Sequence, residues 1–342
     1  MSAKVRMVGI NSIATMAEKR LSNPRLALAV CLTGLALLLC AGCATQKSAV
    51  DLYVDATMLA ELNENEKAIE KLNSALEVNE RFSLAYSLLG DIYRHMRQYE
   101  KSADSYKKAA ELNPWSFDDY FNLGQAYQIM KKFAQAVKAY SRACELKPYH
   151  LQAHINTARS YYELKDYNSA LIYGRRAEQI DADVSEVQKL LGDIYQSQKD
   201  HDQAIASYKR ALEIDSNNAE VMTSLAVAYL RADRNDSAKE LLTAAVQIQP
   251  DNAKAHQYLG YCYLKLGDLD NAVKSYREAI GADYKDWQAH RGLGVAYMVK
   301  ALNTQDEALK TKAIEQWRLS LDIKPDQPSR DKLLKLIGKY SR

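Results

Sequence analysis

Apolar and polar residues recur along this chain with a period of 34 residues, beginning at Ala49. Seven copies follow one another without a gap to Asp286, and an eighth runs from Trp287 to Gln327 with about seven extra residues around 301–310. Within each copy the apolar residues are spaced three and four apart in two groups, which predicts two amphipathic helices. A single helix pair cannot bury its apolar face, so we expect the pairs to stack on one another.

The same residue types recur at fixed places, counting the first residue of each copy as place 1. Small residues at places 8, 20 and 27 allow helix axes to approach to about 8–10 Å. Proline at place 32 of four copies ends the second helix, because it has no amide donor and disfavours helical geometry in the residue before it. Place 8 holds only small residues, and place 11 holds tyrosine in seven copies: Ala56, Gly90, Gly124, Ala158, Gly192, Ala226, Gly260 and Gly294, then Tyr93, Tyr127, Tyr161, Tyr195, Tyr229, Tyr263 and Tyr297.

This pattern resembles the tetratricopeptide repeat (TPR). The resemblance implies an all-α fold, a right-handed TPR superhelix (α-solenoid) of about eight helix-turn-helix repeats with a C-terminal capping helix. The first copy has Asp55 and Leu59 where Leu and Tyr are usual, which suits a terminal repeat. The expected organisation is a leader (1–42), a short tether (43–48), eight repeats (49–82, 83–116, 117–150, 151–184, 185–218, 219–252, 253–286 and 287–327) and a capping helix (328–342).

The leader contains an apolar run from Leu26 to Leu39, preceded by basic residues. Its 14 residues are fewer than the roughly 20 needed to span a bilayer, but they suit the apolar core of a secretory signal. Ala41, Gly42 and Cys43 then resemble the end of a bacterial lipoprotein signal, although Cys40 departs from it, and the resemblance implies lipid attachment to Cys43. Two alternatives remain open, namely cleavage by ordinary signal peptidase near Ala44 and an uncleaved single anchor.

The lipoprotein resemblance also implies a location. Ala44 follows Cys43 where an Asp would indicate the inner membrane in such lipoproteins. We therefore expect a lipid-anchored protein of the bacterial cell envelope, at the outer membrane and facing the periplasm. The alternative is a secreted or periplasmic protein.

Charge argues against nucleic-acid binding. The net charge of +3 combines 46 basic and 43 acidic groups, but residues 1–42 hold five of the basic groups and one of the acidic ones. The rest of the chain therefore carries 41 basic against 42 acidic groups, a net of −1. A nucleic-acid binder gains affinity from clustered Lys and Arg, and the repeats have no such surplus.

Enzymatic chemistry has no candidate residues here. The sequence has no glycine-rich phosphate loop, nucleophile elbow or paired-carboxylate context, so we expect neither catalysis nor a cofactor. His150 and His154 stand four apart, but a metal site would need further ligands. His154 shares place 4 with His256 and His290, which indicates packing residues, and Cys144 and Cys262 are expected to pack as small apolar groups.

The resemblance implies a concave surface built from places 2, 5, 6, 9, 12 and 13 of the first helices, where a protein or peptide partner would bind. Asn122 and Asn156 share place 6 in adjacent repeats and resemble the asparagine ladder of some TPR grooves, the alternative being two solvated asparagines. The candidate partner-binding residues at these places are Asn122, Gln125, Asn156, Arg159, Lys189, Tyr258, Tyr261, Lys265 and Arg291.

Towards the C-terminus the same places become apolar and aromatic: Val227, Leu230, Tyr258, Tyr261, Leu264, Val295 and Met298. Such a patch marks a partner site, unless the insertion or the terminal helix covers it. We therefore expect a non-catalytic scaffold that supports assembly of an envelope complex for secretion, pilus formation, polysaccharide export or wall remodelling. The alternative, suggested by the 23 tyrosines, is a carbohydrate- or small-ligand-binding module.

Overall fold

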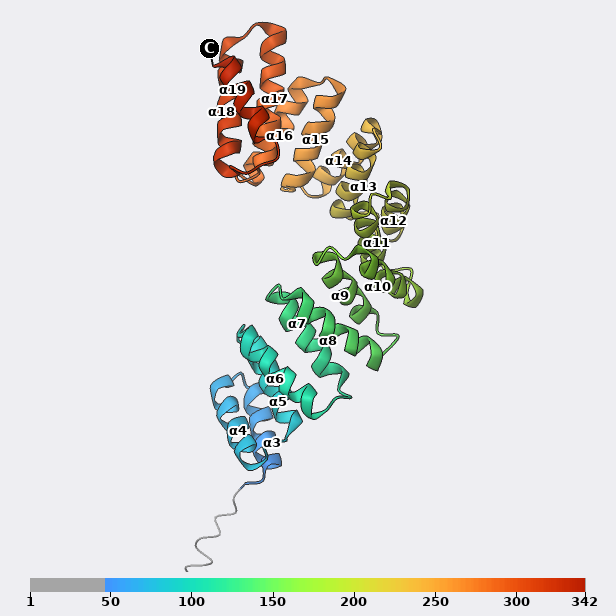
Figure 1. Ribbon diagram of the computed structural model, residues 1–342, viewed down its shortest axis with the longest axis vertical. Coiled ribbons are helices and arrows are strands. Elements are labelled where there is room, and N and C mark those ends of the chain that lie inside the picture. Colours follow the sequence, from blue (N-terminus) through green and yellow to red (C-terminus); the bar gives the residue numbers. More distant parts are fainter. Residues whose placement is uncertain (1–46, 342) are drawn as a thin grey trace, which may run out of the picture. The chain divides into compact units, whose positions relative to one another are not determined.

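The computed structural model describes residues 47–341, and this part of the chain consists of seventeen α-helices without a β-strand (Figure 1). The predicted leader and the lipid attachment at Cys43 lie outside the described residues. Among the helices that are described, none is long and apolar enough to cross a membrane.

The first helix of each pair begins 34 residues after the first helix of the preceding pair. The residues at these starts are the first residues of the eight repeats in the sequence. Most of these helices have 13 residues, and several start with a side-chain cap, as at Ser48, Ser116, Asn218 and Asn252. They are α3 (Ala49–Glu61), α5 (Ser83–His95), α7 (Phe117–Ile129), α9 (Leu151–Glu163), α11 (Ser185–Ser197), α13 (Ala219–Arg231), α15 (Ala253–Leu266) and α17 (Trp287–Thr304).

In the first seven repeats the second helix follows after a short turn in which place 15 has a positive φ, and in the eighth the residue with a positive φ is Gln305. Gly267 takes this conformation in the seventh repeat with φ 80°, and non-glycine residues such as Lys131 and Asp233 take it elsewhere, both with φ 57°. The turn reverses the chain, so that the second helix packs against the first. The second helices are α4 (Asn65–Val78), α6 (Tyr99–Leu112), α8 (Phe133–Leu146), α10 (Tyr167–Ile180), α12 (His201–Ile214), α14 (Asn235–Ile248), α16 (Leu269–Ala282) and α18 (Glu307–Ile323).

The two helices of a repeat meet through a pairing of places 8 and 24. A Cβ atom built on Gly124 would lie 2.5 Å from the ring of Tyr140, and one built on Gly294 would lie 2.4 Å from the ring of Trp317. Glycine therefore leaves the space that the buried ring at place 24 occupies. Where place 8 carries alanine, as at Ala226, place 24 carries a smaller residue, here Leu242. The repeat pattern predicts the small residues at place 8, whereas their partner at place 24 is evident only from the structure.

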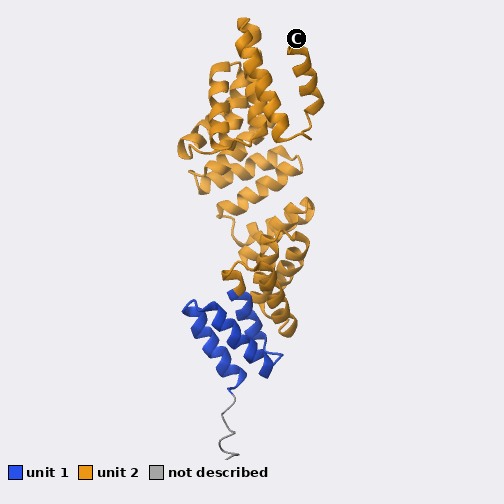
Figure 2. Cartoon of the chain, turned by 90° about the vertical axis from the view of Figure 1, so that its left-hand side faces the viewer, with its two compact units in different colours: residues 1–92 blue, residues 93–342 orange. Residues whose placement is uncertain are grey.

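The described chain forms two compact units, which divide within α5 after Ile92 (Figure 2). In the first unit, Ala49, Leu52 and Ala75 form a buried cluster with Phe82 packed against it. In the second unit, the largest buried cluster extends continuously over the helices from α9 to α15. The candidate site lies wholly in the second unit.

The extra residues of the eighth repeat lengthen its two helices. Helix α17 has 18 residues and α18 has 17, and only Gln305 and Asp306 connect them. Helix α19 (Arg330–Tyr340) follows at the expected C-terminal position. Its Leu333 is buried in a cluster with Met298, Ile314 and Trp317, so α19 covers apolar surface of the last repeat.

Candidate functional site

The nine candidate residues lie on first helices of the second unit, namely α7, α9, α11, α15 and α17. Lys265 and Tyr261 are exposed, the latter at 38%, whereas Asn156 is buried at 6%. The other six are half-buried. The structure divides them into a middle group on α7, α9 and α11 and a C-terminal group on α15 and α17.

Asn122 and Asn156, the pair at place 6, have different surroundings. The Asn156 amide accepts a hydrogen bond from Gln152 Nε2 at 3.0 Å and donates one to Tyr140 Oη at 3.4 Å. Tyr140 Oη in turn donates to Gln128 Oε1 at 2.7 Å. Within the described chain, the side chains of Asn122 and Gln125 make no such bond and are half-buried. The two place-6 amides are thus not equivalent, and their binding role remains a prediction.

Ion pairs within the chain engage both cations of the middle group. Arg159 Nη2 lies 2.7 Å from Glu186 Oε1 of the next repeat. Lys189 Nζ lies 3.0 Å from Asp193 Oδ2 and 3.1 Å from Glu220 Oε1. Burial alone would lower the pKa of Lys189, but the two carboxylates outweigh it and raise the pKa. These cations therefore connect consecutive first helices and already have carboxylate partners.

The C-terminal group surrounds a cavity between α15 and α17, which we call the α15–α17 cavity. Its volume is about 370 Å³, and Tyr258, Tyr261 and Arg291 all line it. Lys265 is beside it, with Nζ 5.7 Å from the centroid of the Tyr261 ring. The sequence thus predicted four residues that the fold brings together. The remaining lining residues are Gln257, Leu264, Tyr276, Gln288, Gly292 and Val295.

Helices α15 and α17, which supply all lining residues of the cavity except Tyr276 of α16, carry no acidic residue, whereas every other first helix carries at least one. Arg291 Nη1 donates to the neutral hydroxyl of Ser329 at 2.8 Å. Neither Lys254 nor Lys265 forms an ion pair with any described residue. Asp286, which caps α17 by accepting from the amides of Gln288 and Ala289, is the nearby acid whose charge affects Tyr258 and Tyr276. The cavity is therefore edged by cations without carboxylate partners.

Tyr276 lies in the cavity wall, although the repeat pattern did not predict it as a site residue. Its side chain is 3% exposed, and its hydroxyl has no hydrogen-bond partner in the described chain. The matching hydroxyls of Tyr140 and Tyr208 donate to Gln128 at place 12 and to Asp193 at place 9. In the seventh repeat these two places hold Leu264 and Tyr261. Comparing places 9, 12 and 24 across the repeats would have found this difference.

Gly292 makes room for Tyr276 in the cavity. It stands at place 6 of the eighth repeat, where Asn122, Asn156 and Tyr258 stand in theirs. A Cβ atom built on Gly292 would lie 2.3 Å from Cζ of Tyr276. Any larger residue at this position would have to displace the ring, so the glycine is required for this arrangement of the wall.

Burial raises the pKa of both Tyr258 and Tyr276. At neutral pH both hydroxyls therefore keep their protons and can donate a hydrogen bond.

The terminal helix covers part of the predicted apolar patch. Met298 is 4% exposed because it packs with Leu333 of α19, and Val295 is half-buried against the same cluster. Val227 is also buried, at 7%. Tyr258, Tyr261 and Leu264 still line the α15–α17 cavity, so the patch is covered at its C-terminal end but not at its centre.

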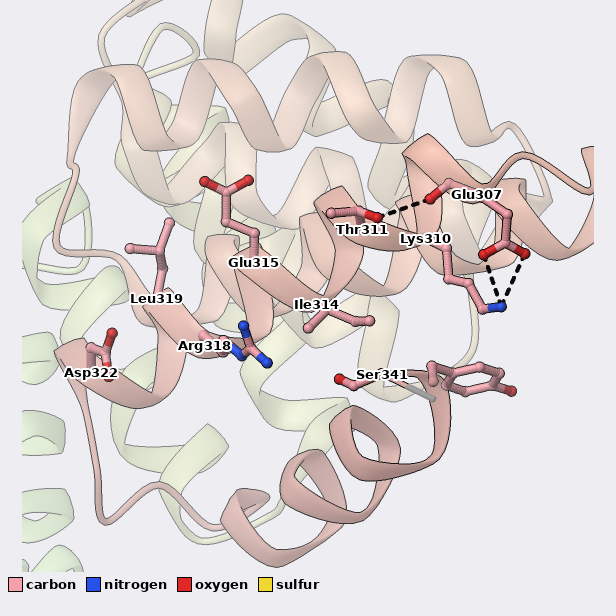
Figure 3. Close-up of a pocket in the computed structure, with 10 residues that line it drawn as sticks. Glu307, Lys310, Thr311, Ile314, Glu315, Arg318, Leu319, Asp322 and Ser341 are labelled. Carbon is pink, nitrogen blue, oxygen red and sulfur yellow. Dashed lines mark hydrogen bonds and ion pairs between the residues drawn. The ribbon is translucent and has the colours of Figure 1, made fainter.

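A second cavity of about 630 Å³ lies between α18 and the end of α19 (Figure 3). It is lined by side chains of both charge signs, including Glu307, Lys310, Glu315 and Arg318. Lys310 Nζ lies 3.0 Å from Glu307 Oε1, so this cation already has a partner. The mixed and partly paired charges favour no particular ligand.

The histidines at place 4 share a structural role. A ring nitrogen of each is hydrogen-bonded to the backbone carbonyl six residues earlier: His154 to Pro148 at 2.9 Å, His256 to Pro250 at 2.9 Å and His290 to Tyr284 at 3.1 Å. These bonds fasten the start of a first helix to the end of the preceding repeat. Cys144 and Cys262 are both buried, as expected of small packed residues.

Comparison with known families confirms the repeats. Sequence profiles described as tetratricopeptide repeat match residues 118–150 and 263–311, and one described as TPR repeat matches 90–131. A fourth, described as the cytochrome c-type biogenesis protein H TPR domain, matches 189–282. No curated protein matches the sequence.

Solved structures share the fold at low sequence identity. A tetratricopeptide repeat protein from Parabacteroides merdae is 14% identical with a TM-score of 0.55, covering 72% of this chain and 98% of its own. PilF of Pseudomonas aeruginosa is 20% identical with a TM-score of 0.52, and the match covers 60% of this chain and 94% of PilF. A chain of the Cut9–Hcn1 hetero-tetramer of APC/C is 15% identical with a TM-score of 0.54, and the match covers 73% of this chain and 53% of that one. The predicted fold class, a TPR α-solenoid with a C-terminal helix, is confirmed.

Proposed function

We propose that this chain, an array of tetratricopeptide repeats, is a non-catalytic scaffold that binds protein or peptide partners on the first helices of its second unit. The observation that carries the proposal is the α15–α17 cavity. It combines the apolar and aromatic side chains of Tyr258, Tyr261, Leu264 and Val295 with Arg291. Aromatic and arginine side chains in one recess are typical of the residues that dominate binding energy at protein interfaces.

A protein or peptide suits this face better than a sugar does. The carbohydrate alternative depended on the many tyrosines, but the rings of Tyr106, Tyr140 and Tyr208 are fully buried in helix packing. Half-exposed polar side chains such as Gln125 and Arg159 stand at the same places on earlier helices of the second unit. Such polar groups can hydrogen-bond the backbone of a partner segment, while the cavity holds one of its side chains.

The proposal is tested by photo-crosslinking the full-length chain in the cells that produce it, followed by identification of the captured proteins. We expect a defined set of partners whose capture falls at least tenfold when Tyr258→Ala and Tyr261→Ala are combined. The matched control combines Tyr149→Ala and Tyr284→Ala, which remove two highly exposed tyrosines (77% and 61%) from the loops between repeats. If the amount of captured protein did not change with Tyr258→Ala and Tyr261→Ala combined, partner binding at this face would be contradicted.

We further propose that the scaffold is held at a bacterial envelope membrane by lipid on Cys43 and supports assembly of an envelope complex there. Support comes from the apolar run of 26–39, from Ala41 and Gly42 before Cys43, and from the match of 189–282 to a TPR domain named for cytochrome c biogenesis. Two or three acyl chains would hold the protein firmly, at about 0.8 kcal/mol per buried CH₂ group.

Metabolic labelling with tritiated palmitate tests this anchor. We expect label in the wild-type chain and none in Cys43→Ser, with Cys40→Ser as the matched control that keeps its label. Equal labelling of wild type and Cys43→Ser would exclude Cys43 as the attachment site. Fractionation of the same cells locates the labelled protein, which we expect in the outer membrane.

A further inference from the structure

The α15–α17 cavity contains hydrogen-bonding groups that indicate the chemistry of a ligand that would fit it. The hydroxyl of Tyr276, on a side chain 3% exposed, has no partner in the described chain and belongs to a wall of the cavity. The hydroxyl lies next to Gly292, which also lines the cavity, so a ligand atom bound there can accept its hydrogen bond. The charge of Arg291 affects Tyr276, and Arg291 lines the same cavity. A cation and a donor hydroxyl together favour an anionic oxygen.

The surroundings favour an anion further. Lys265 lies beside Tyr261, and Lys254 precedes Tyr258 by one helical turn on the same face of α15. The charge of Arg231 at the end of α13 also affects Tyr258. None of these three cations forms an ion pair with a described residue. Helices α15 and α17 carry no acid between their first and last residues, and the nearby Asp286 at the N-cap of α17 accepts from the amides of Gln288 and Ala289 rather than from these cations.

The remaining walls are apolar. Tyr258, Leu264 and Val295 line the cavity and offer two kinds of apolar surface, aromatic and aliphatic. An inorganic anion would leave this surface in contact with water. A ligand that joins a carboxylate to a large apolar group would bury it, at about 25 cal/mol for each Å² removed from water.

Building on the proposed function, we infer that the cavity binds a peptide carboxylate at Arg291 and the Tyr276 hydroxyl, with an adjacent large apolar side chain packed against Tyr258, Leu264 and Val295. The carboxylate belongs either to an Asp or Glu side chain or to the C-terminus of the partner. Both sources present the same chemistry to the cavity, and the experiment separates them.

The test selects peptides from two random heptapeptide libraries on the full-length chain, purified in mild detergent because of its apolar leader. One library ends in a free C-terminal carboxylate and the other is flanked on both sides by a neutral linker. We expect peptides with an aromatic or large aliphatic residue next to a carboxylate. Enrichment in the first library alone identifies a C-terminal carboxylate, and enrichment in both identifies an acidic side chain.

Affinities of the selected peptides for single variants then test the two contacts. Tyr276→Phe keeps the ring and removes the hydroxyl, and we expect about tenfold weaker binding with unchanged thermal stability. Its matched control is Tyr140→Phe, which removes a hydroxyl that is hydrogen-bonded to Gln128 and should lower stability without changing affinity. Arg291→Gln should weaken binding at least tenfold. Ser329→Ala removes only the hydrogen-bond partner of Arg291 and should bind as wild type does.

Two results would overturn the inference, and they differ from failure of the proposed function. Selected peptides without a preference for carboxylates, or equal affinity of wild type and Tyr276→Phe, would exclude carboxylate recognition. If those peptides still lost binding to the Tyr258→Ala and Tyr261→Ala double variant, the scaffold function would stand. If the wild-type chain enriched no peptide more strongly than that double variant does, both carboxylate recognition and the scaffold function would be contradicted.

Discussion

Tyrosine at place 24 behaves in two ways in this protein. In the third and fifth repeats the ring fills the space over a glycine, and its hydroxyl donates to Gln128 or Asp193 of the same repeat. In the seventh repeat Tyr276 keeps the packing, but its hydroxyl has no acceptor among the described residues, and Tyr261 and Leu264 occupy the two places that supply an acceptor in those repeats. The residues at places 9 and 12 thus determine whether the hydroxyl at place 24 is engaged within its own repeat.

The contact between the glycine at place 8 and the ring at place 24 predicts that two substitutions there compensate each other. Gly124→Ala puts a methyl group 2.5 Å from the Tyr140 ring, and overpacking of this kind costs about 1–3 kcal/mol of unfolding free energy. Combining it with Tyr140→Leu reproduces the native Ala226–Leu242 pair, so we expect the double variant to be more stable than the sum of the single effects.

Urea denaturation of the four proteins measures this coupling. Gly281→Ala is the control, since a Cβ atom on this helical glycine meets nothing within 4 Å and alanine should stabilise its helix by up to about 1 kcal/mol. Strict additivity of the two substitutions would contradict the pairing of places 8 and 24.

The two buried cysteines give a prediction about reactivity. Burial raises the pKa of Cys262 to about 12 and also raises the pKa of Cys144, so both stay as thiols at pH 8. Since the thiolate is the nucleophile and an unfolded cysteine has a pKa near 8.5, we expect iodoacetamide to modify both only after unfolding in guanidinium. Mass spectrometry of the labelled peptides reports each site. Rapid labelling of Cys262 in the folded chain would show that it is accessible.

Among the helices, those at the C-terminal end determine how much of the proposed partner-binding face is available. The extra residues of the eighth repeat extend α17 and α18 rather than forming a loop, and α19 then packs on them through Leu333. Arg291 of α17 contacts Ser329, the residue before α19, so the start of the capping helix is tied to the edge of the cavity.

Loosening α19 should be a local event. Leu333 is 3% exposed and packs with Met298, Ile314 and Trp317, and Leu→Ala in a core typically costs about 2–5 kcal/mol. We expect Leu333→Ala to speed amide hydrogen exchange in α18 and α19, whereas Leu334→Ala, at 44% exposure on the same helix, should change little. Equal effects of the two variants would mean that α19 is not held through Leu333.

Across the whole molecule, contacts are made mainly between neighbouring helices. Each helix from α6 to α18 contacts the next one along the chain, and first helices also contact the next first helix, as α13 does α15 and α15 does α17. Stability is then approximately a sum of repeat and nearest-neighbour terms.

A change in one repeat should therefore have little effect several repeats away. We expect Gly124→Ala to speed hydrogen exchange in α7 and α8 and to leave α15 to α18 unchanged. Hydrogen-exchange mass spectrometry on the full-length chain measures both regions at once. An equal loss of protection in both would indicate one cooperative unit and contradict the nearest-neighbour description.

The sequence by itself determined the helix pairs, their spacing and the terminal helix. These depend on local periodicity and on small residues at fixed places, which recur in all eight repeats, and on proline, which ends four of them. It also predicted Tyr258, Tyr261, Lys265 and Arg291 as candidates, because the repeat register alone assigns them to one face. Their role in binding stays a prediction.

Only the tertiary structure decided which of the candidates are available and what they surround. Ion pairs and hydrogen bonds that engage Arg159, Lys189 and Asn156 join side chains of different repeats, and the sequence does not specify their rotamers. The composition shows a nearly neutral body, yet Lys254, Lys265 and Arg291 at the α15–α17 cavity form no ion pair with a described residue. The cavity itself requires Gly292 of one repeat to meet Tyr276 of another, and a contact between repeats is decided by how they pack.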